Sequence, residues 1–132
     1  MTDRPAIEPG TWPAADASEE VSPAQLAFRL GRGSAAVRLI DCREDDEFAF
    51  NRIDGARHLP LSRWPQLGPS LLETGAAGAG EESPPVVVYC HHGVRSLQAV
   101  RWLRARGLAA CFSLAGGIES WSIEVDSNVP RY

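Results

Sequence analysis

The residue types that could do chemistry in this chain gather around Cys90. From that position the sequence reads Cys-His-His-Gly-Val-Arg-Ser, so a thiol is followed by imidazoles, a guanidinium and a hydroxyl. A free cysteine has a pKa of about 8.5 and reacts as its thiolate. The N–H groups of a loop that opens a helix, with an arginine nearby, favour that thiolate and a small anion beside it. We predict that Cys90 is the nucleophile and that the loop binds the substrate through His91, His92, Gly93, Val94, Arg95 and Ser96.

Cys90 stands where a buried strand is expected to give way to a helix. Residues 86–88 are three valines that follow two prolines, which is typical of a short strand buried on both faces. From Val94 to Leu103 apolar residues recur at three-residue spacing, which predicts a helix ended by Gly107. The alternative is a buried, inert cysteine at a strand end, and the strand-loop-helix context argues against it.

The rest of the chain alternates short strands and helices. Ser22 is a predicted N-cap, with Pro23 at the first helical position and Gln25 completing a capping box, and Gly31 follows the helix. Further strands are predicted at residues 37–40, 58–59 and 111–114, and further helices at 44–50, around Trp64 and at 118–123. This alternation predicts an α/β fold, a small central parallel β-sheet with helices on both faces. Because ligands bind beyond the carboxyl ends of such strands, we expect residues 41–43 and 90–95 to share one crevice.

Length and composition exclude several classes of function. A chain of 132 residues fits a single domain, and a net charge of −4 argues against nucleic-acid binding. All thirteen basic residues are arginine, so no lysine can serve as a base or a Schiff-base former. No apolar run has the length of a membrane span, and residues 1–15 lack the apolar core of a secretory signal. We therefore expect a cytoplasmic protein with no membrane association, whose cysteines are reduced.

Two stretches are expected to lie outside regular structure. Residues 1–20 are rich in proline, alanine and acids, and are interpreted as an irregular N-terminal arm. Trp12, within this arm, is expected to pack against the domain. Residues 74–85 are rich in glycine, alanine, glutamate and proline, and are interpreted as a mobile surface loop. The folded domain is therefore expected over residues 21–132.

Four segments together resemble the rhodanese-like sulfurtransferases, in that family's order. They are Asp41-Cys42-Arg43-Glu44, Ile53-Asp54-Gly55-Ala56, the loop beginning at Cys90, and Leu114-Ala115-Gly116-Gly117-Ile118 with Trp121. The resemblance covers residues 22–132 and implies the same α/β fold, so residues 21–132 are identified as a rhodanese-like domain. Asn51-Arg52 departs from the pattern, since family members often carry Gly-His there, and a role for that histidine is not implied for this chain.

The resemblance implies a sulfurtransferase that needs no cofactor. The Cys90 thiolate would take the outer sulfur of a small anionic donor, such as thiosulfate, as a persulfide. Cyanide, a thiol or a sulfur-carrier protein would accept the sulfur in a second displacement. Rhodanese-like domains also occur fused to adenylyltransferases that activate sulfur carriers, and residues 125–132 resemble the end of such domains. A non-catalytic or accessory module that serves such a partner is therefore an alternative.

A cysteine phosphatase or arsenate reductase is a further alternative. Those enzymes also place a thiolate under a ring of N–H donors closed by an arginine, with the spacing Cys-x5-Arg. Cys90 and Arg95 are one residue closer together, and the smaller ring is expected to favour a single sulfur atom over a tetrahedral phosphate.

Asp41, Cys42 and Arg43 allow more than one interpretation. Arg43 could hold the anionic donor or brace the loop as an ion pair. Bracing is favoured for Asp41, although both residues belong to the candidate substrate-binding set. Cys42 is expected to pack, with a resolving role beside Cys90 as the alternative, and Cys111 is expected in the core. No metal is expected, because adjacent histidines point apart and no further ligand spacing completes a site.

Overall fold

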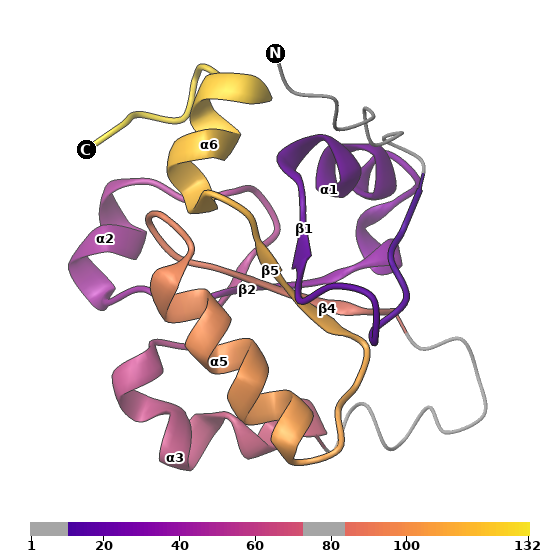
Figure 1. Cartoon of the computed structure of the whole chain (residues 1–132). Helices are drawn as coiled ribbons and strands as arrows, with labels where there is room; N and C mark the ends of the chain where they lie inside the picture. The colour runs from indigo at the N-terminus through magenta and orange to yellow at the C-terminus, as the bar shows by residue number, and fades with distance from the viewer. Residues whose placement is uncertain (1–10, 73–83) are drawn as a thin grey trace.

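The computed structural model describes residues 11–72 and 84–132, which form one layered unit around a parallel sheet (Figure 1). Its five strands lie in the order β1-β5-β4-β2-β3, and every neighbouring pair is parallel. The strands are β1 Glu20–Val21, β2 Arg38–Asp41, β3 Arg57–His58, β4 Val86–Tyr89 and β5 Cys111–Leu114. The helices are α1 Pro23–Leu30, α2 Asp45–Phe50, α3 Trp64–Leu67, α5 Val94–Ala105 and α6 Gly117–Glu124, with 3₁₀ turns at Ser34–Ala36 and Leu61–Arg63. The predicted α/β class is confirmed.

Each face of the sheet has its own apolar core. Val86 and Val88 point into one core, beneath α5 and α3, whereas Val87 points into the other, beneath α1 and α6 (Figure 1). All three valines are fully buried, as predicted for a strand covered on both faces. The central strand β4 therefore holds the two cores together and carries Cys90 at its end.

The predicted capping signals form at the helix ends. Ser22 Oγ accepts a hydrogen bond from the Gln25 N–H at 3.0 Å, and Gln25 Oε1 accepts one from the Ser22 N–H at 2.8 Å, which completes the capping box of α1. Gly107 adopts a φ of 102° after the end of α5, a conformation that favours glycine. The local signals in the sequence were therefore sufficient to place both helices.

Three strands differ from the sequence-based prediction. Strand β2 includes Asp41, which was expected just after the strand, and β3 is Arg57–His58, one residue earlier than expected. Strand β1 was not predicted at all, since two residues have no detectable periodicity, yet Glu20 pairs with Ser113 of β5. Residues 11–19 form no helix or strand, and Trp12 packs as expected, edge-on to Phe112 at 5.6 Å between ring centroids. Most of the expected surface loop, residues 74–83, lies outside the described residues.

The carboxyl ends of β2 and β4 lie side by side. Asp41 is in register with Tyr89, and the Cys42 N–H donates to the Tyr89 carbonyl oxygen at 3.1 Å. The segments that follow the two strands therefore begin at the same edge of the sheet. Residues 41–43 and 90–95 therefore lie close together, and a crevice shared between them stays a prediction.

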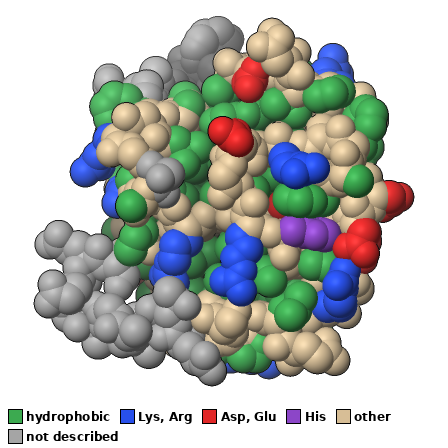
Figure 2. Space-filling view, turned by 180° about the vertical axis from the view of Figure 1, so that it is seen from behind, with side chains coloured by type: hydrophobic (Ala, Val, Ile, Leu, Met, Phe, Trp, Pro, Cys, Tyr) green, Lys and Arg blue, Asp and Glu red, His purple; other side chains and the backbone are tan. Residues whose placement is uncertain are grey.

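Charges of both signs are distributed over the surface. On the face shown in Figure 2, basic side chains are separated by acidic and apolar ones. Within residues 11–72 and 84–132, no helix has the length and apolar character needed to cross a membrane.

Candidate active site

The Cys90 sulfur lies at the centre of a turn of backbone donors. Its side chain is almost fully buried, and Sγ accepts hydrogen bonds from the Gly93 N–H at 3.0 Å and the Ser96 N–H at 3.3 Å. Ser96 Oγ lies 3.4 Å from Sγ and 2.7 Å from Ser113 Oγ, so a buried hydroxyl pair lies behind the sulfur. These donors favour negative charge on sulfur, because hydrogen bonds to the charged form stabilise it.

The start of α5 supplies further donors. Val94 and Arg95 occupy the first turn of the helix, where backbone N–H groups have no intrahelical acceptor. Gly93 precedes the helix with a φ of 107°, a conformation that lets the loop curl without a side chain. An atom bonded to the Cys90 sulfur would therefore face unsatisfied N–H groups at the positive end of a twelve-residue helix.

The first residues of α6 hold the loop after Cys90 through backbone hydrogen bonds. The Ile118 N–H donates to the Cys90 carbonyl oxygen at 2.9 Å, and the Glu119 N–H donates to the His91 carbonyl oxygen at 3.1 Å. Gly117 permits this approach, because a Cβ atom there would overlap both carbonyl groups, and its φ of 64° also favours glycine. The resemblance singled out Gly117 as part of a motif, and the structure supplies the reason for the glycine.

Arg95 is held by α2 rather than directed at the sulfur. Its Nη1 and Nη2 atoms donate to the two carboxylate oxygens of Glu47 at 2.8 and 2.9 Å. The hydrogen bonds from Arg95 lower the pKa of Glu47 to about 2, and the same pair raises the pKa of Arg95. The expected full positive charge beside Cys90 is thus paired, and Arg95 ties the end of the loop to α2.

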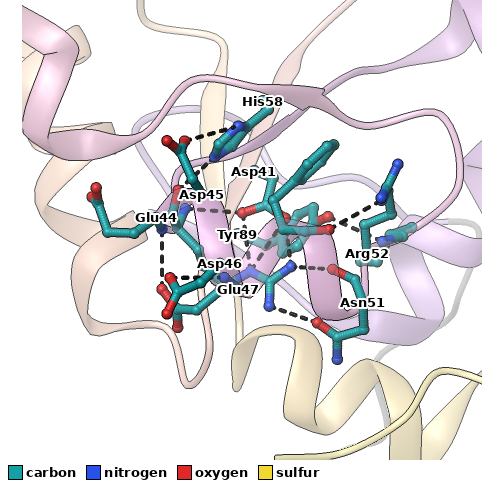
Figure 3. Close-up of polar contacts among 12 residues, drawn as sticks. Asp41, Glu44, Asp45, Asp46, Glu47, Asn51, Arg52, His58 and Tyr89 are labelled. Atoms are coloured by element: carbon teal, nitrogen blue, oxygen red, sulfur yellow. Dashed lines mark hydrogen bonds and ion pairs between the residues drawn. The ribbon is translucent and has the colours of Figure 1, made fainter.

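Arg43 forms a buried brace with Asp41. Both side chains are fully buried, and Arg43 Nη2 lies 2.7 Å from Asp41 Oδ2. The remaining N–H groups of Arg43 donate to Asp41 Oδ1, to the Asn51 side-chain and backbone oxygens, and to the Tyr132 hydroxyl, so all five are used. Asp41, Glu47 and Asn51 converge from β2 and α2 in Figure 3. Of the two interpretations of Arg43, this geometry supports bracing, and a role of Asp41 and Arg43 in substrate binding stays a prediction.

An aromatic stack covers the first residues of the loop. The rings of His91 and His92 stack with centroids 3.8 Å apart, so the expectation that these adjacent histidines point apart is wrong. Tyr132 stacks on His91 at the same centroid distance and an interplanar angle of 9°. Burial, with a smaller effect of His92, lowers the pKa of His91. His91 therefore lies between Tyr132 and His92 beside the loop, and His92 is exposed at its rim.

The three cysteines occupy different surroundings. Cys42 is fully buried on the same face of the sheet as Cys90, and burial, with Cys90 and Asp41 nearby, raises the pKa of its thiol. Burial also raises the pKa of Cys111, to about 11, and its thiol donates to backbone oxygens in the core. All three are unpaired.

Sequence reasoning missed the residues that support the loop. Glu47, Ser113 and Tyr132 touch the predicted site residues but were not predicted to do so. Glu47 was visible only as an acid in the first turn of a helix, and Tyr132 only as the last residue of the C-terminal tail. Asn51, noted as a departure from the family pattern, turns out to accept from Arg43 at 2.7 Å. Within the described residues no group of three or more possible metal ligands occurs.

Comparison with known proteins identifies related sequences along most of the chain. A family model described as "Rhodanese-like domain" matches residues 22–124. The chain is 32% identical over 98 residues to thiosulfate sulfurtransferase GlpE of Stutzerimonas stutzeri, covering 74% of this chain and 81% of that protein. It is 36% identical over 94 residues to uncharacterized protein YqhL of Bacillus subtilis, covering 71% and 66% respectively.

Other relatives are much longer than this chain. The chain spans 30% of a rhodanese-like/PpiC domain-containing protein of Arabidopsis thaliana and 19% of an adenylyltransferase and sulfurtransferase of Zea mays, to which it is 30% and 35% identical. What those whole proteins do is therefore not transferable to this chain directly.

Solved structures share the fold. A rhodanese-related protein from Thermoplasma volcanium superposes with a TM-score of 0.66 at 28% identity, covering 81% of this chain and 93% of that one. A human single-domain sulfurtransferase superposes with a TM-score of 0.63, also at 28% identity, covering 81% and 97%.

Proposed function

Because this chain belongs to the rhodanese-like domain family, we propose that it is a sulfurtransferase that carries a sulfane sulfur on Cys90 as a persulfide. The observation that carries the proposal is the pair of backbone N–H groups, from Gly93 and Ser96, that point at the Cys90 sulfur. A buried cysteine needs such donors to be present as a nucleophilic thiolate. A cysteine that only packs in the core stays a thiol and has no need of them.

The reaction consists of two displacements at sulfur. In the first, the Cys90 thiolate attacks the outer sulfur of thiosulfate, a new S–S bond forms, and sulfite leaves with the electron pair of the broken bond. In the second, a nucleophile such as cyanide attacks the terminal sulfur, and the Cys90 thiolate leaves. No electrons enter or leave the system, so no redox partner is needed, and ping-pong kinetics are expected.

The loop stabilises charge on the terminal sulfur of the persulfide. The free N–H groups of Val94 and Arg95 in the first turn of α5 are suited to that charge. The Glu47–Arg95 pair then acts by holding the loop in shape. His91 and His92 line the entrance, where a donor such as thiosulfate would arrive.

The proposal extends to setting and partners. We place the protein in the cytoplasm, where cellular reductants keep thiols such as Cys90 reduced. The acceptor there is a small thiol or a sulfur-carrier protein. The accessory alternative, in which the domain serves a separate adenylyltransferase, would use the same Cys90 persulfide and differ only in the acceptor.

Intact-mass measurement tests the covalent step. After incubation with thiosulfate the protein should gain the mass of one sulfur atom, and cyanide or a reductant should remove it. Cys90→Ser should form no adduct, whereas Cys42→Ser should form it as the wild type does. If Cys90→Ser still gains sulfur, the assignment of Cys90 is wrong. If the wild type ignores thiosulfate but hydrolyses an aryl phosphate through Cys90, the phosphatase alternative takes its place.

A further inference from the structure

The hydroxyl of Tyr132 connects the buried brace to the residue that holds the loop. Arg43 Nη1 donates to it at 2.9 Å, and it donates to Glu47 Oε2 at 2.8 Å. These directions are forced, because a guanidinium can only donate and a carboxylate can only accept. Partial burial raises the pKa of Tyr132 to about 12, so the hydroxyl keeps its proton over the whole working range of pH.

Helix α2 needs such a connection. It carries Glu47, which holds Arg95 at the end of the loop, but none of its own residues, Asp45–Phe50, is buried. Phe48 of α2 stacks on His58 at 4.4 Å between ring centroids, and Asp45 forms a mostly exposed ion pair with Arg63, but neither contact involves the Cys90 loop. The hydroxyl of Tyr132 anchors Glu47 to Arg43, which is fully buried and whose N–H groups are all used.

Tyr132 is itself held firmly by the residues before it. The Ser122 hydroxyl donates to the Val129 carbonyl oxygen at 2.5 Å, and the Asn51 side-chain amide donates to the Pro130 carbonyl oxygen at the same distance. Val129 is buried against the α6 face of the sheet. The ring of Tyr132 is thereby set against His91, the residue that follows the nucleophile.

We propose that Tyr132 is a positioning residue for sulfur transfer, which fixes the Cys90 loop at both ends. At the far end it acts through Glu47 on Arg95, and at the near end its ring packs on His91. The proposal rests on the sulfur-transfer function above. It goes beyond it by assigning the C-terminal segment to the site and by separating the contribution of the hydroxyl from that of the ring.

Single-turnover kinetics of the two half-reactions test this role. Tyr132→Phe removes the hydroxyl and keeps the ring, and Tyr132→Ala removes both. Because the same N–H groups stabilise the same sulfur in both steps, Tyr132→Phe should slow loading by thiosulfate and unloading by cyanide alike, each by about tenfold. Tyr132→Ala should slow both further. A change in thiosulfate loading alone would show a contact with the donor and overturn the positioning role.

The neighbouring Arg131 provides a matched control. It lies in the same segment and forms a surface ion pair with Glu119. Arg131→Gln should change both half-reactions by no more than about twofold, because exposed ion pairs contribute little. If it slows them as much as Tyr132→Phe does, the effect belongs to anchoring of the tail in general, and the specific role of Tyr132 is refuted. Thermal unfolding of each variant confirms that it is folded at the assay temperature.

A double-mutant cycle tests whether the hydroxyl acts through Glu47. In a Glu47→Gln background, Tyr132→Phe should slow each half-reaction by less than about twofold, since the group that the hydroxyl positions has already been altered. If the two effects multiply, the hydroxyl acts independently of Glu47 and the proposal is wrong.

A spectroscopic measurement separates this inference from the proposed function. Rotation of the Arg95 guanidinium, followed by NMR, should be slow in the wild type and in Arg131→Gln, and faster in Tyr132→Phe. The His91 ring protons should shift in Tyr132→Ala, which loses the stacked ring, and much less in Tyr132→Phe. If thiosulfate adds no sulfur to the wild type, the function fails, while these signals still decide whether Tyr132 holds the loop. Unchanged signals in every variant would refute the positioning role.

Discussion

At the scale of single residues, position in the strand-loop-helix unit gives two neighbouring cysteines different surroundings. Cys90 receives backbone N–H groups on its sulfur, whereas Cys42, next to it on the neighbouring strand, is surrounded by apolar side chains. Both sit at the ends of parallel strands and share one face of the sheet. The difference between them comes from the loop that follows, because only the residues after Cys90 curl back over the sulfur.

We predict that Cys42 is unreactive in the folded protein. Burial raises the pKa of the Cys42 thiol, so the thiol stays protonated near neutral pH and does not react as a thiolate. Iodoacetamide at a pH of about 7.5, followed by peptide mass mapping, should modify Cys90 and leave Cys42 unmodified, and denatured protein should be modified at both. Labelling of Cys42 under native conditions, or loss of the persulfide in Cys42→Ala, would instead support the resolving role.

The strand-loop-helix unit around Cys90 was predictable from the sequence, and the partners of the arginines were not. The type and order of residues 86–96 are local, and local patterns determine strand ends, loops and helix starts. Arg95 meets Glu47 only because β2 and β4 are adjacent, although 48 positions separate the two residues. A sequence shows which side chains are charged, but the pairing of Arg43 and Arg95 depends on the tertiary fold.

At the scale of elements, the approach of α6 to the loop depends on one glycine. Gly117→Ala should destabilise the protein by more than about 2 kcal/mol, because the new Cβ overlaps the Cys90 and His91 carbonyl groups and the left-handed conformation disfavours alanine. Gly55→Ala is the control, since Gly55 has a φ of 87° but nothing within 4 Å of the point where a Cβ would lie. Gly55→Ala should lower the free energy of unfolding by only about 1 kcal/mol. Urea unfolding measures both, and equal losses would show that the close approach is unimportant.

The ion pair between α2 and α5 should lose its contribution in acid. Arg95 lowers the pKa of Glu47 from 4.5 to about 2, so the folded state favours the carboxylate. Its contribution to stability is therefore complete above pH 4.5 and decreases as the pH falls towards 2. Unfolding of the wild type, Glu47→Gln, Arg95→Gln and the double variant gives the coupling free energy at each pH. A coupling that stays constant from neutral pH down to a pH of about 3 would contradict this prediction.

The boundaries of an element were predicted accurately where its local sequence signal was strong. Helix α1 begins at its predicted N-cap, Ser22, because a capping box is encoded within four consecutive residues. Helix α5 has sustained periodicity and a glycine after its end. Strands β1 and β3 have two residues each, so only their neighbours in the sheet define them. Short elements that depend on tertiary pairing were therefore misplaced or missed.

At the scale of the whole molecule, Arg104 on α5 holds the N-terminal segment to the sheet. Its guanidinium donates to the carbonyl oxygens of Ala15, Ser18 and Cys111, at distances from 2.7 to 3.1 Å. This joins residues at three separate places in the chain, and β1 adds to the sheet beside them. From Thr11, whose carbonyl oxygen accepts a hydrogen bond from the Gln25 side chain, the described part of the N-terminal arm lies against the rest of the protein.

Arg104→Gln should therefore destabilise the fold without affecting the chemistry. We expect the free energy of unfolding to fall by about 1–3 kcal/mol, because partly buried carbonyl groups lose charged donors, with an unchanged rate of persulfide formation. Arg101→Gln, on the same helix, removes only an exposed ion pair with Glu19 and should cost less than about 1 kcal/mol. Urea unfolding together with the thiosulfate reaction measures both properties. Equal losses from the two variants would show that Arg104 has no special place in the fold.

The sequence predicts the class of the sheet but not the order of its strands. The alternation of strands and helices predicts a parallel sheet, but β5-β4-β2 could not be ordered from periodicity alone. What the sequence did support was the common edge, because the carboxyl ends of parallel strands lie on the same side. The sequence therefore predicts that Cys90 and Arg43 lie in the same region, but it does not predict their individual contacts.

The two outer strands of the sheet, β1 and β3, are only two residues long. A sheet edge offers its unpaired backbone groups as a template on which another chain can aggregate, and short edges limit that growth. The uncharged strand Val86–Tyr89, which is rich in β-branched residues, is central in the sheet and fully buried. Fibril formation should therefore require global unfolding, so that any seed begins from denatured chains and native molecules do not add to one another.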